Sequence, residues 1–301
     1  MELTGVLPLL KPKGLTSHDC VMKLRRILRT KKIGHTGTLD PDVTGVLPIC
    51  IGRATKIAEY LTDYPKRYEG EATLGYSTTT EDASGELVEK LIVERAPSRE
   101  EVRRVLESFK GNIIQIPPMY SAVKVNGKKL YEYARAGQEV ERPKREVHIY
   151  ELRLLSEITT LDDTATFRFD VLCSKGTYVR TLAVDIGSAL GYPAHMSALT
   201  RTAAGPFTLE QCVSLDTVEM LMQKEDLNRV IVSIDKVLAH FPKIVVNKLV
   251  EEKVKNGSVL EMDIAEKRFT VYNEEGICLA IYQQHPTKSG MIKPEKMLHI
   301  K

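Results

Sequence analysis

The sequence is poor in cysteine, and its cysteines follow no pattern. There are five, and no two are spaced as in CxxC: Cys20, Cys50, Cys173, Cys212 and Cys278. This argues against a disulfide framework and against a zinc site, so we expect buried, reduced thiols and no metal. The chain also lacks an apolar run near the roughly 20 residues of a membrane span, and no basic segment precedes the short N-terminal run that Pro8 interrupts. We therefore expect a cytoplasmic protein.

Motifs of the common cofactor enzymes are also missing. The sequence contains no GxGxxG after a predicted strand, no P-loop, no GxSxG and no HExxH, and its seven histidines lie far apart. Cofactor and metal chemistry therefore have little support, and we expect no cofactor. The net charge of +3, from 43 basic and 40 acidic residues, is too small to indicate a nucleic-acid partner by itself. The distribution of the charges has to decide that question.

What the sequence does contain is a glycine-rich segment that displays one carboxylate. In GHTGTLDPDVTGVLPICIG, residues 34–52, Asp40 lies between hydrophobic segments and directly before Pro41. The proline fixes the backbone after the acid and favours an extended conformation at Asp40. Four glycines allow sharp turns and close approach to a ligand: Gly34, Gly37, Gly45 and Gly52. The segment predicts a reactive loop, and the alternative is a surface turn that Asp40 caps.

Two segments concentrate positive charge. Residues 23–32 carry six cations and no acid: Lys23, Arg25, Arg26, Arg29, Lys31 and Lys32. Residues 123–145 carry three acids and seven cations: Lys124, Lys128, Lys129, Arg135, Arg142, Lys144 and Arg145. Tyr131 and Tyr133 lie among the latter, and Asn126-Gly127 predicts a tight turn there. Both segments favour phosphate contacts, and the alternative is that each is a solvated surface.

Periodicity predicts helices and strands in alternation. We expect a strand from Gly5 into a helix that Ser17 caps, a short helix over 56–61, a strand through Tyr68, and a polar loop over 76–90. Ser98 and Glu101 form a capping box that begins the next helix. Further strands are expected at 146–155 and 165–173, then a helix with Arg180 near its start and another at 215–222. After a boundary at Phe241-Pro242, short strands at 243–246, 268–272 and 278–282 predict a small β-rich module. The expected fold class is α+β, with a mixed sheet followed by a small β domain.

Three motifs in this order, GTLDP at 37–41, KRY at 66–68 and TYVRTL at 177–182, resemble those of the TruB family of tRNA pseudouridine synthases. The combination is specific, whereas no single motif is. The resemblance implies that Asp40 is the nucleophile, that Tyr68 stacks on the target uracil and that Arg180 pairs with the aspartate. A mainly antiparallel sheet and an RNA-gripping insertion at about 123–145 are implied as well.

The resemblance assigns four further residues to the substrate site. Lys11, in KPKGLTS, matches a lysine that braces the catalytic loop, and we group it with the substrate-binding residues. His35 matches a histidine that contacts the rearranged RNA loop, and Leu199 matches the apolar floor of the uracil pocket. Asp82 matches an acid at the edge of the RNA-binding cleft. The residues expected on the RNA backbone are Lys23, Arg26, Arg29, Lys31, Lys32, Lys124, Lys128, Lys129 and Arg135.

The family pattern also implies domains and a partner. Residues 1–240 would form the catalytic domain, and residues 241–301 resemble the PUA domain, a small β-barrel that contacts RNA. The expected substrate is uridine 55 in the T loop of tRNA, whose acceptor end the PUA-like domain would grip. We expect a monomer that needs no protein partner. Two departures are visible, since Val43 stands where a smaller alanine is usual and Thr200 replaces one of two paired arginines.

Two other functions compete with this prediction. One is a catalytic subunit directed by a separate guide RNA, as in dyskerin, whose catalytic motifs are close relatives. The arm-like insertion and the small C-terminal module favour the stand-alone enzyme. The other is a non-catalytic protein that binds tRNA or assists its folding, which an intact Asp40, Tyr68 and Arg180 argue against as the sole role.

Overall fold

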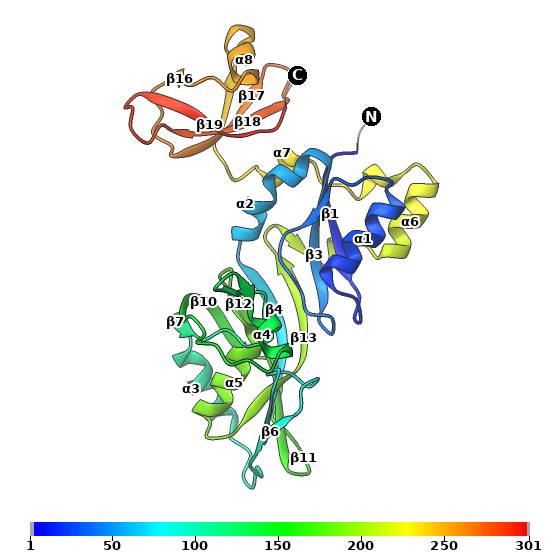
Figure 1. Cartoon of the computed structure of the whole chain (residues 1–301), viewed down its shortest axis with the longest axis vertical. Coiled ribbons are helices and arrows are strands. Elements are labelled where there is room, and N and C mark those ends of the chain that lie inside the picture. Colours follow the sequence, from blue (N-terminus) through cyan, green and yellow to red (C-terminus); the bar gives the residue numbers. More distant parts are fainter. Residues whose placement is uncertain (1–2, 300–301) are drawn as a thin grey trace.

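The computed structural model describes residues 3–299, and a ten-stranded sheet forms its largest part (Figure 1). Seven strands follow the order β1-β3-β13-β4-β12-β10-β7, while β2 pairs with β3, β11 with β12 and β14 with β13. The strands are β1 Gly5–Lys11, β2 Ile33–His35, β3 Thr44–Ile51, β4 Lys66–Leu74, β7 Gly111–Gln115, β10 Arg145–Leu154, β11 Thr159–Leu161, β12 Thr164–Cys173, β13 Ala194–Ala204 and β14 Phe207–Thr208. Within the described residues, β13 and β3 make the sheet's one parallel pairing. The sheet is therefore mixed and mainly antiparallel, as predicted.

Helices cover the sheet in two groups. In Figure 1, α1 and α6 lie side by side next to β1 and β3, whereas α3 and α5 lie beside β10, β12 and β4. The helices are α1 Ser17–Ile27, η1 Gly52–Ile57, α2 Ala58–Asp63, α3 Arg99–Ser108, α4 Leu130–Arg135, α5 Val179–Ala189, η2 Leu209–Gln211, α6 Leu215–Gln223, η3 Leu227–Arg229, α7 Ile234–Val237 and α8 Lys248–Lys255. The capping box at Ser98 and Glu101 is confirmed. No helix within residues 3–299 combines the length and apolar character needed to cross a bilayer.

The residue that caps α1 differs from the prediction. Thr16, not Ser17, is the N-cap, because its hydroxyl accepts a hydrogen bond from the backbone of Asp19 and the Asp19 carboxylate bonds back to Thr16. This reciprocal arrangement satisfies two helix-end donors at once. Ser17 is left to bind elsewhere: its hydroxyl accepts a hydrogen bond of 2.8 Å from the backbone N–H of Leu39. It thus ties the helix to the residue before Asp40.

Two hairpins leave the main sheet. The first, formed by β5 Tyr76–Thr78 and β6 Leu87–Lys90, lies where we predicted a polar loop. That prediction was wrong because β6 is exposed throughout, so no alternation of buried and exposed residues marked it. The second, formed by β8 Lys124–Val125 and β9 Lys128–Lys129, turns at Asn126-Gly127 as predicted. It leads directly into α4, and together they form the arm.

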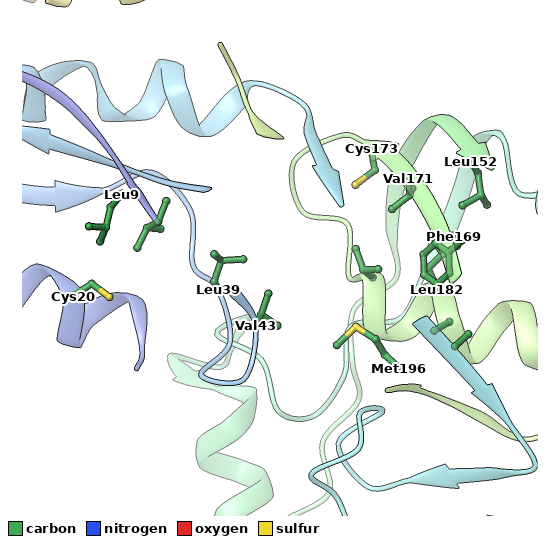
Figure 2. Packing of buried hydrophobic residues seen from close by; sticks show 14 of the residues in the cluster. Leu9, Cys20, Leu39, Val43, Leu152, Phe169, Val171, Cys173, Leu182 and Met196 are labelled. Atoms are coloured by element: carbon green, nitrogen blue, oxygen red, sulfur yellow. The ribbon is translucent and has the colours of Figure 1, made fainter. Parts of the chain in front are cut away.

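The hydrophobic core continues across the Asp40 loop. Figure 2 shows Leu39 and Val43 between one group around Leu9 and Cys20 and another around Phe169 and Leu182. Leu39 and Val43 are 4% and 3% exposed. The two residues that flank the Asp40-Pro41-Asp42 turn are therefore fixed by burial, and the turn between them projects from a rigid base.

The C-terminal module has its own five-stranded sheet and its own core. The strand order is β15-β17-β18-β19-β16, from β15 Lys243–Val246, β16 Leu260–Glu261, β17 Arg268–Asn273, β18 Cys278–Gln284 and β19 Met291–Met297. This curled sheet carries α8 and stands at one end of the molecule (Figure 1). A separate apolar cluster joins the module to the larger part, with Ile57 and Phe207 on one side and Tyr272, Ile281 and Leu298 on the other. The predicted fold class, α+β followed by a small β module, is confirmed.

Candidate active site

Asp40 is held by contacts to the backbone on both sides of it. Besides the bond from Leu39 to Ser17, the ammonium of Lys11 donates to the carbonyl oxygens of Pro41 at 3.1 Å and Val43 at 2.7 Å. Three of the four glycines of the segment take positive φ, whereas Gly34 lies in β2 and does not. The loop is therefore fixed by side chains as well as by its glycines.

Lys11 holds the Asp40 loop by hydrogen bonds to backbone carbonyls. Its side chain is fully buried, and its three protons are donated to the carbonyls of Pro12, Pro41 and Val43. It lines neither of the two cavities next to Asp40. The structure thus places Lys11 beneath the loop as a brace, and not on the wall of a substrate cavity.

Arg180 forms an ion pair with Asp40. The Arg180 Nε lies 3.1 Å from Oδ2 of Asp40, and the arginine side chain is only 6% exposed. Its two terminal nitrogens donate to the backbone carbonyls of Thr80 and Tyr120, each at 2.9 Å. Nη1 also lies 3.6 Å from the carboxylate of Asp82. The guanidinium is thereby fixed in one orientation, with its Nε directed at Asp40.

Burial and charge act on Asp40 in opposite directions. Burial raises the pKa of the Asp40 carboxyl, the Arg180 guanidinium lowers it, and the neighbouring Asp82 raises it again. The net direction is upward, so Arg180 offsets part of the cost of burying the charge and does not reverse it. The Asp40 side chain nevertheless remains 42% exposed, so it is accessible to a reactant.

Two cavities meet at this ion pair. The smaller, of about 280 Å³, is lined by Tyr68 from β4 and by the turn from β12 into α5. The larger, of about 710 Å³, extends between β13 and the arm, where Tyr131 and Arg135 line it. Both cavities contain the same four residues: Asp40, Val43, Arg180 and Leu199. A carboxylate at the junction of two cavities can attack a group in one while the rest of a large ligand occupies the other.

The structure brings together five of the seven predicted catalytic and substrate-binding residues and leaves the other two, Lys11 and His35, outside the cavities. Those lining the cavities are Asp40, Tyr68, Asp82, Arg180 and Leu199. His35 lies on β2 outside both cavities, and burial and the nearby Arg201 lower the pKa of its imidazole. The imidazole is therefore neutral at physiological pH.

The predicted RNA-backbone residues fall into two places. Arg135 lines the larger cavity, and the remaining arm cations, Lys124, Lys128 and Lys129, lie on the hairpin beside it. Lys129 and Arg135 both stand over the ring of Tyr131, at 5.3 and 5.4 Å from its centroid. The cations on and after α1, Lys23, Arg26, Arg29, Lys31 and Lys32, are exposed and line neither cavity. The fold thus provides one basic surface at the site and a second at α1.

Lys66 and Arg201, two basic residues that the sequence did not single out, line the smaller cavity, as does Lys175. Burial and Arg201 lower the pKa of Lys66 to about 8, and its ammonium donates to the carbonyls of Thr62 and Tyr64. Arg201 lies on β13, a strand that we did not predict. The KRY and LTRT motifs contain both residues, but no local pattern separates a cation that lines a cavity from one on a surface.

Comparison with known proteins finds similarity to pseudouridine synthases along nearly the whole chain. Residues 25–179 match the family described as TruB family pseudouridylate synthase (N terminal domain), and residues 180–239 match the tRNA pseudouridylate synthase B C-terminal domain. The chain is 58% identical to the tRNA pseudouridine synthase B of Halalkalibacterium halodurans, over 99% of this chain and 98% of that one. It is 61% identical to the protein of that name from Bacillus cytotoxicus, over 98% and 97%.

Among solved structures, the fold is similar to a chain from a Cbf5-Nop10-Gar1 complex. The TM-score is 0.72 and the sequence identity is 27%, and the match covers 98% of this chain and 85% of that one. A chain from a H/ACA RNP bound to a substrate RNA matches with a TM-score of 0.70 and 26% identity, again over 98% and 85%. The similarity includes both the large sheet and the C-terminal module, since almost the whole chain is aligned.

Proposed function

Because the chain belongs to the TruB family of pseudouridylate synthases, which are isomerases, we propose that it converts uridine to pseudouridine in the T loop of tRNA, at position 55. The observation that carries the proposal is the Asp40–Arg180 ion pair at the junction of two cavities. Asp40 is the nucleophile, and the fixed Arg180 guanidinium orients it and stabilises its charge.

The isomerisation of uridine requires a single ionised carboxylate as the nucleophile. The N1–C1′ bond breaks, the uracil turns, and a C5–C1′ bond forms, while C5 loses a proton and N1 gains one. Atoms and electrons are conserved, so the reaction consumes no oxidant, reductant or co-substrate. Attack by Asp40 at C6 of the base and attack at C1′ of the sugar both require the ionised carboxylate, which Arg180 favours.

The target uridine must leave its stacked loop to reach Asp40. Flipping a nucleotide costs a few kcal/mol, which contacts in the pocket must offset. Tyr68 and Leu199 are both half-buried and lie on the adjacent strands β4 and β13, where they line the smaller cavity with Asp40. In our proposal Tyr68 stacks on the flipped uracil and Leu199 forms the floor beneath it.

The rest of the T loop occupies the larger cavity. Asp82 stands at its edge, and Arg135 and Tyr131 of the arm face it from the other side. Unstacked RNA loops are bound in this manner, by aromatic faces and by cations on the backbone. The exposed cations of α1 and of the arm hairpin contact phosphates, and His35 contacts the rearranged loop.

The proposal also gives a different role to each of the two domains. Residues 1–240 form the catalytic domain, and residues 241–301 form an RNA-binding domain that contacts the acceptor end of tRNA. The enzyme acts in the cytoplasm as a monomer without a guide RNA or a protein partner. The β8–β9 hairpin and α4 support this, because they give the chain its own clamp over the larger cavity.

The test is to incubate the purified protein alone with an unmodified tRNA transcript and to map pseudouridine by a chemical that stops reverse transcription at the modified base. We expect one modified position, in the T loop. A transcript with cytidine at that position serves as the control. Modification only after a guide RNA is added would favour the guided alternative, and tight binding without any modification would favour a role in tRNA folding.

A further inference from the structure

The largest side chain that the fold buries completely, among residues 3–299, is an arginine. Arg201 is 1% exposed. Its Nε donates to the carbonyl of Val46 at 2.7 Å, and its Nη2 donates to the carbonyl of Gly37 at 3.2 Å. Gly37 precedes Asp40 by three residues and Val46 follows it by six. One guanidinium therefore binds the backbone on both flanks of the segment that carries Asp40.

Within residues 3–299, this buried cation has no carboxylate partner. No described acidic side chain forms an ion pair with Arg201, and the charged neighbours that it influences include Lys11 and Lys66, which are also cations. Burying an unpaired charge among like charges is costly, and carbonyl dipoles offset only part of that cost. A residue needed only to fill the core would be apolar, so the guanidinium points to a requirement of the site.

The backbone of Arg201 also pairs with the segment that carries Asp40. It pairs with Gly45 in the parallel contact between β13 and β3. A Cβ at Gly45, where φ is +122°, would stand 2.2 Å from the Arg201 carbonyl oxygen, so only glycine permits this approach. On its other side Arg201 pairs with Tyr68 across β13 and β4. Burial raises the pKa of the Tyr68 hydroxyl, and the Arg201 guanidinium lowers it in part. Directly opposed residues of antiparallel strands lie on the same face of the sheet.

We propose that Arg201 is a positioning residue that sets the distance between Asp40 and the ring of Tyr68. It does so by binding Gly37 and Val46 on the Asp40 segment and lying opposite Tyr68 on β4. The proposal rests on the proposed function, since it gives a role in that reaction to a residue two positions after Leu199. Arg201 binds the backbone on both sides of Asp40 and lies opposite Tyr68, and because it is only 1% exposed it acts on the uridine through them.

The test compares Arg201→Gln and Arg201→Lys with the wild-type enzyme on unmodified tRNA, in single turnover at saturating protein, together with tRNA affinity. Misplacing a reacting group by about 1 Å costs on the order of 100-fold in rate. We expect a loss of that order in Arg201→Gln, with affinity within about threefold of wild type because other residues contact the RNA backbone. Arg201→Lys keeps the charge and the aliphatic stem but lacks the planar guanidinium, whose separate nitrogens reach the carbonyls of Val46 and Gly37, and we expect a roughly tenfold loss.

A matched control separates positioning from folding. Val218→Ala removes a fully buried side chain from α6, in the core but away from the cavities, and lowers thermal stability without touching the site. Measured below its melting temperature, it should keep the wild-type single-turnover rate. The inference fails if Arg201→Gln and Arg201→Lys keep the wild-type rate, or if their loss only matches that of Val218→Ala at equal loss of stability. An inactive wild-type enzyme in the same assay would instead refute the proposed function.

Discussion

At the residue scale, the site is built around Asp40, whose backbone is held rigidly and whose carboxylate is accessible. Leu39 and Val43 are buried on either side of the turn, and Lys11 and Ser17 hold the backbone between them. The Asp40 side chain is nevertheless 42% exposed, next to an Arg180 that is 6% exposed. Display of a reactive group and fixation of its backbone are thus achieved by different residues.

Asp40→Asn should abolish pseudouridine formation and leave tRNA affinity nearly unchanged. The amide keeps the shape of the side chain but is not a nucleophile, and removing a catalytic nucleophile costs roughly 10⁴-fold or more in rate. The measurement is single-turnover modification of unmodified tRNA, beside a filter-binding assay. Asp42→Asn, on the same exposed turn, is the control and should stay active. Appreciable turnover by Asp40→Asn, in a preparation free of host enzyme, would refute the role of Asp40.

The pH dependence should report the two charges next to Asp40. Only the ionised carboxylate attacks, and burial raises its pKa, so the rate should fall with decreasing pH at a higher pH than for an ordinary aspartate. Arg180→Gln removes a cation that lowers this pKa, so the acid limb should move to higher pH. Asp82→Asn removes an anion that raises it, so the limb should move to lower pH.

Normalised single-turnover rates across the acid range measure these shifts independently of any loss in absolute rate. The two variants are controls for one another because both alter a side chain next to Asp40 but change the charge in opposite directions. Shifts in the same direction would show that the acid limb reports unfolding or RNA binding and not Asp40.

At the scale of single elements, the arm is held together by its own contacts. The β8–β9 hairpin is joined to α4 by the bond from the Lys129 backbone to Glu132, and Tyr133 donates to the carbonyl of Val125 at 3.0 Å. Three cations stand over two tyrosine rings, with Lys128 over Tyr133 at 5.8 Å from its centroid and the other two over Tyr131. Tyr131 lines the larger cavity, whereas Tyr133 holds the hairpin through its bond to Val125.

Neutralising Lys128, Lys129 and Arg135 together should weaken tRNA binding and flatten its dependence on salt. Each lost phosphate contact lowers the slope of log K against log salt by about 0.7 to 0.9. Because Arg135 and Tyr131 also line the cavity, we expect the single-turnover rate at saturating tRNA to fall as well. Binding isotherms at several salt concentrations provide the slope.

The control for the arm is a triple neutralisation of Arg103 and Arg104, on α3, and Lys110, just after it, none of which lines either cavity. It should leave both the affinity and the slope near wild type. Equal effects of the two triple variants would mean that net charge and not the arm governs binding. If the arm variant instead keeps the wild-type affinity and slope, the arm is a solvated surface, and the phosphate contacts must be sought among the cations of α1.

At the scale of the whole molecule, the C-terminal module is attached by a shared core and by polar contacts. The apolar cluster draws on both parts, and Lys56 donates to the carbonyl of Met297 at 2.7 Å while Lys296 pairs with Glu59 at 2.8 Å. An interface with an apolar centre holds two domains more firmly than a polar one. In our proposal this fixes the distance between the acceptor end and the T loop of one bound tRNA.

Ile281→Ala should destabilise the protein by about 2–5 kcal/mol, because Ile281 is fully buried in the cluster that joins the two parts. Leu249→Ala, on α8 of the same module, is the control: that side chain is 72% exposed, so its loss should change stability by no more than about 0.5 kcal/mol. Urea denaturation measures both. We also expect Ile281→Ala to lose more affinity for whole tRNA than for an isolated T stem-loop, and equal losses would contradict the role given to the module.

Local sequence patterns determined much of this protein. The period-2 alternation of β4 and β12, the capping box of α3 and the apolar stripe of α5 depend on residues a few positions apart, so they predict elements directly. Asp40, Tyr68 and Arg180 were visible for the same reason, since each stands in a short motif. The strand β6 escaped because it is exposed throughout, and β13 escaped because its buried residues, at its two ends and at Arg201, do not alternate with exposed ones.

Only the tertiary structure decided which charges share one site. Arg201 and Lys66 meet Asp40 because β13, β4 and β3 are neighbours in the sheet, although the residues are up to 161 positions apart. The placement of Lys11 beneath the loop and the upward direction of the Asp40 pKa also depend on burial, which a local pattern does not contain. The physical reason is that motifs encode the chemistry of a side chain, whereas its solvation and its charged neighbours arise only when distant strands pack together.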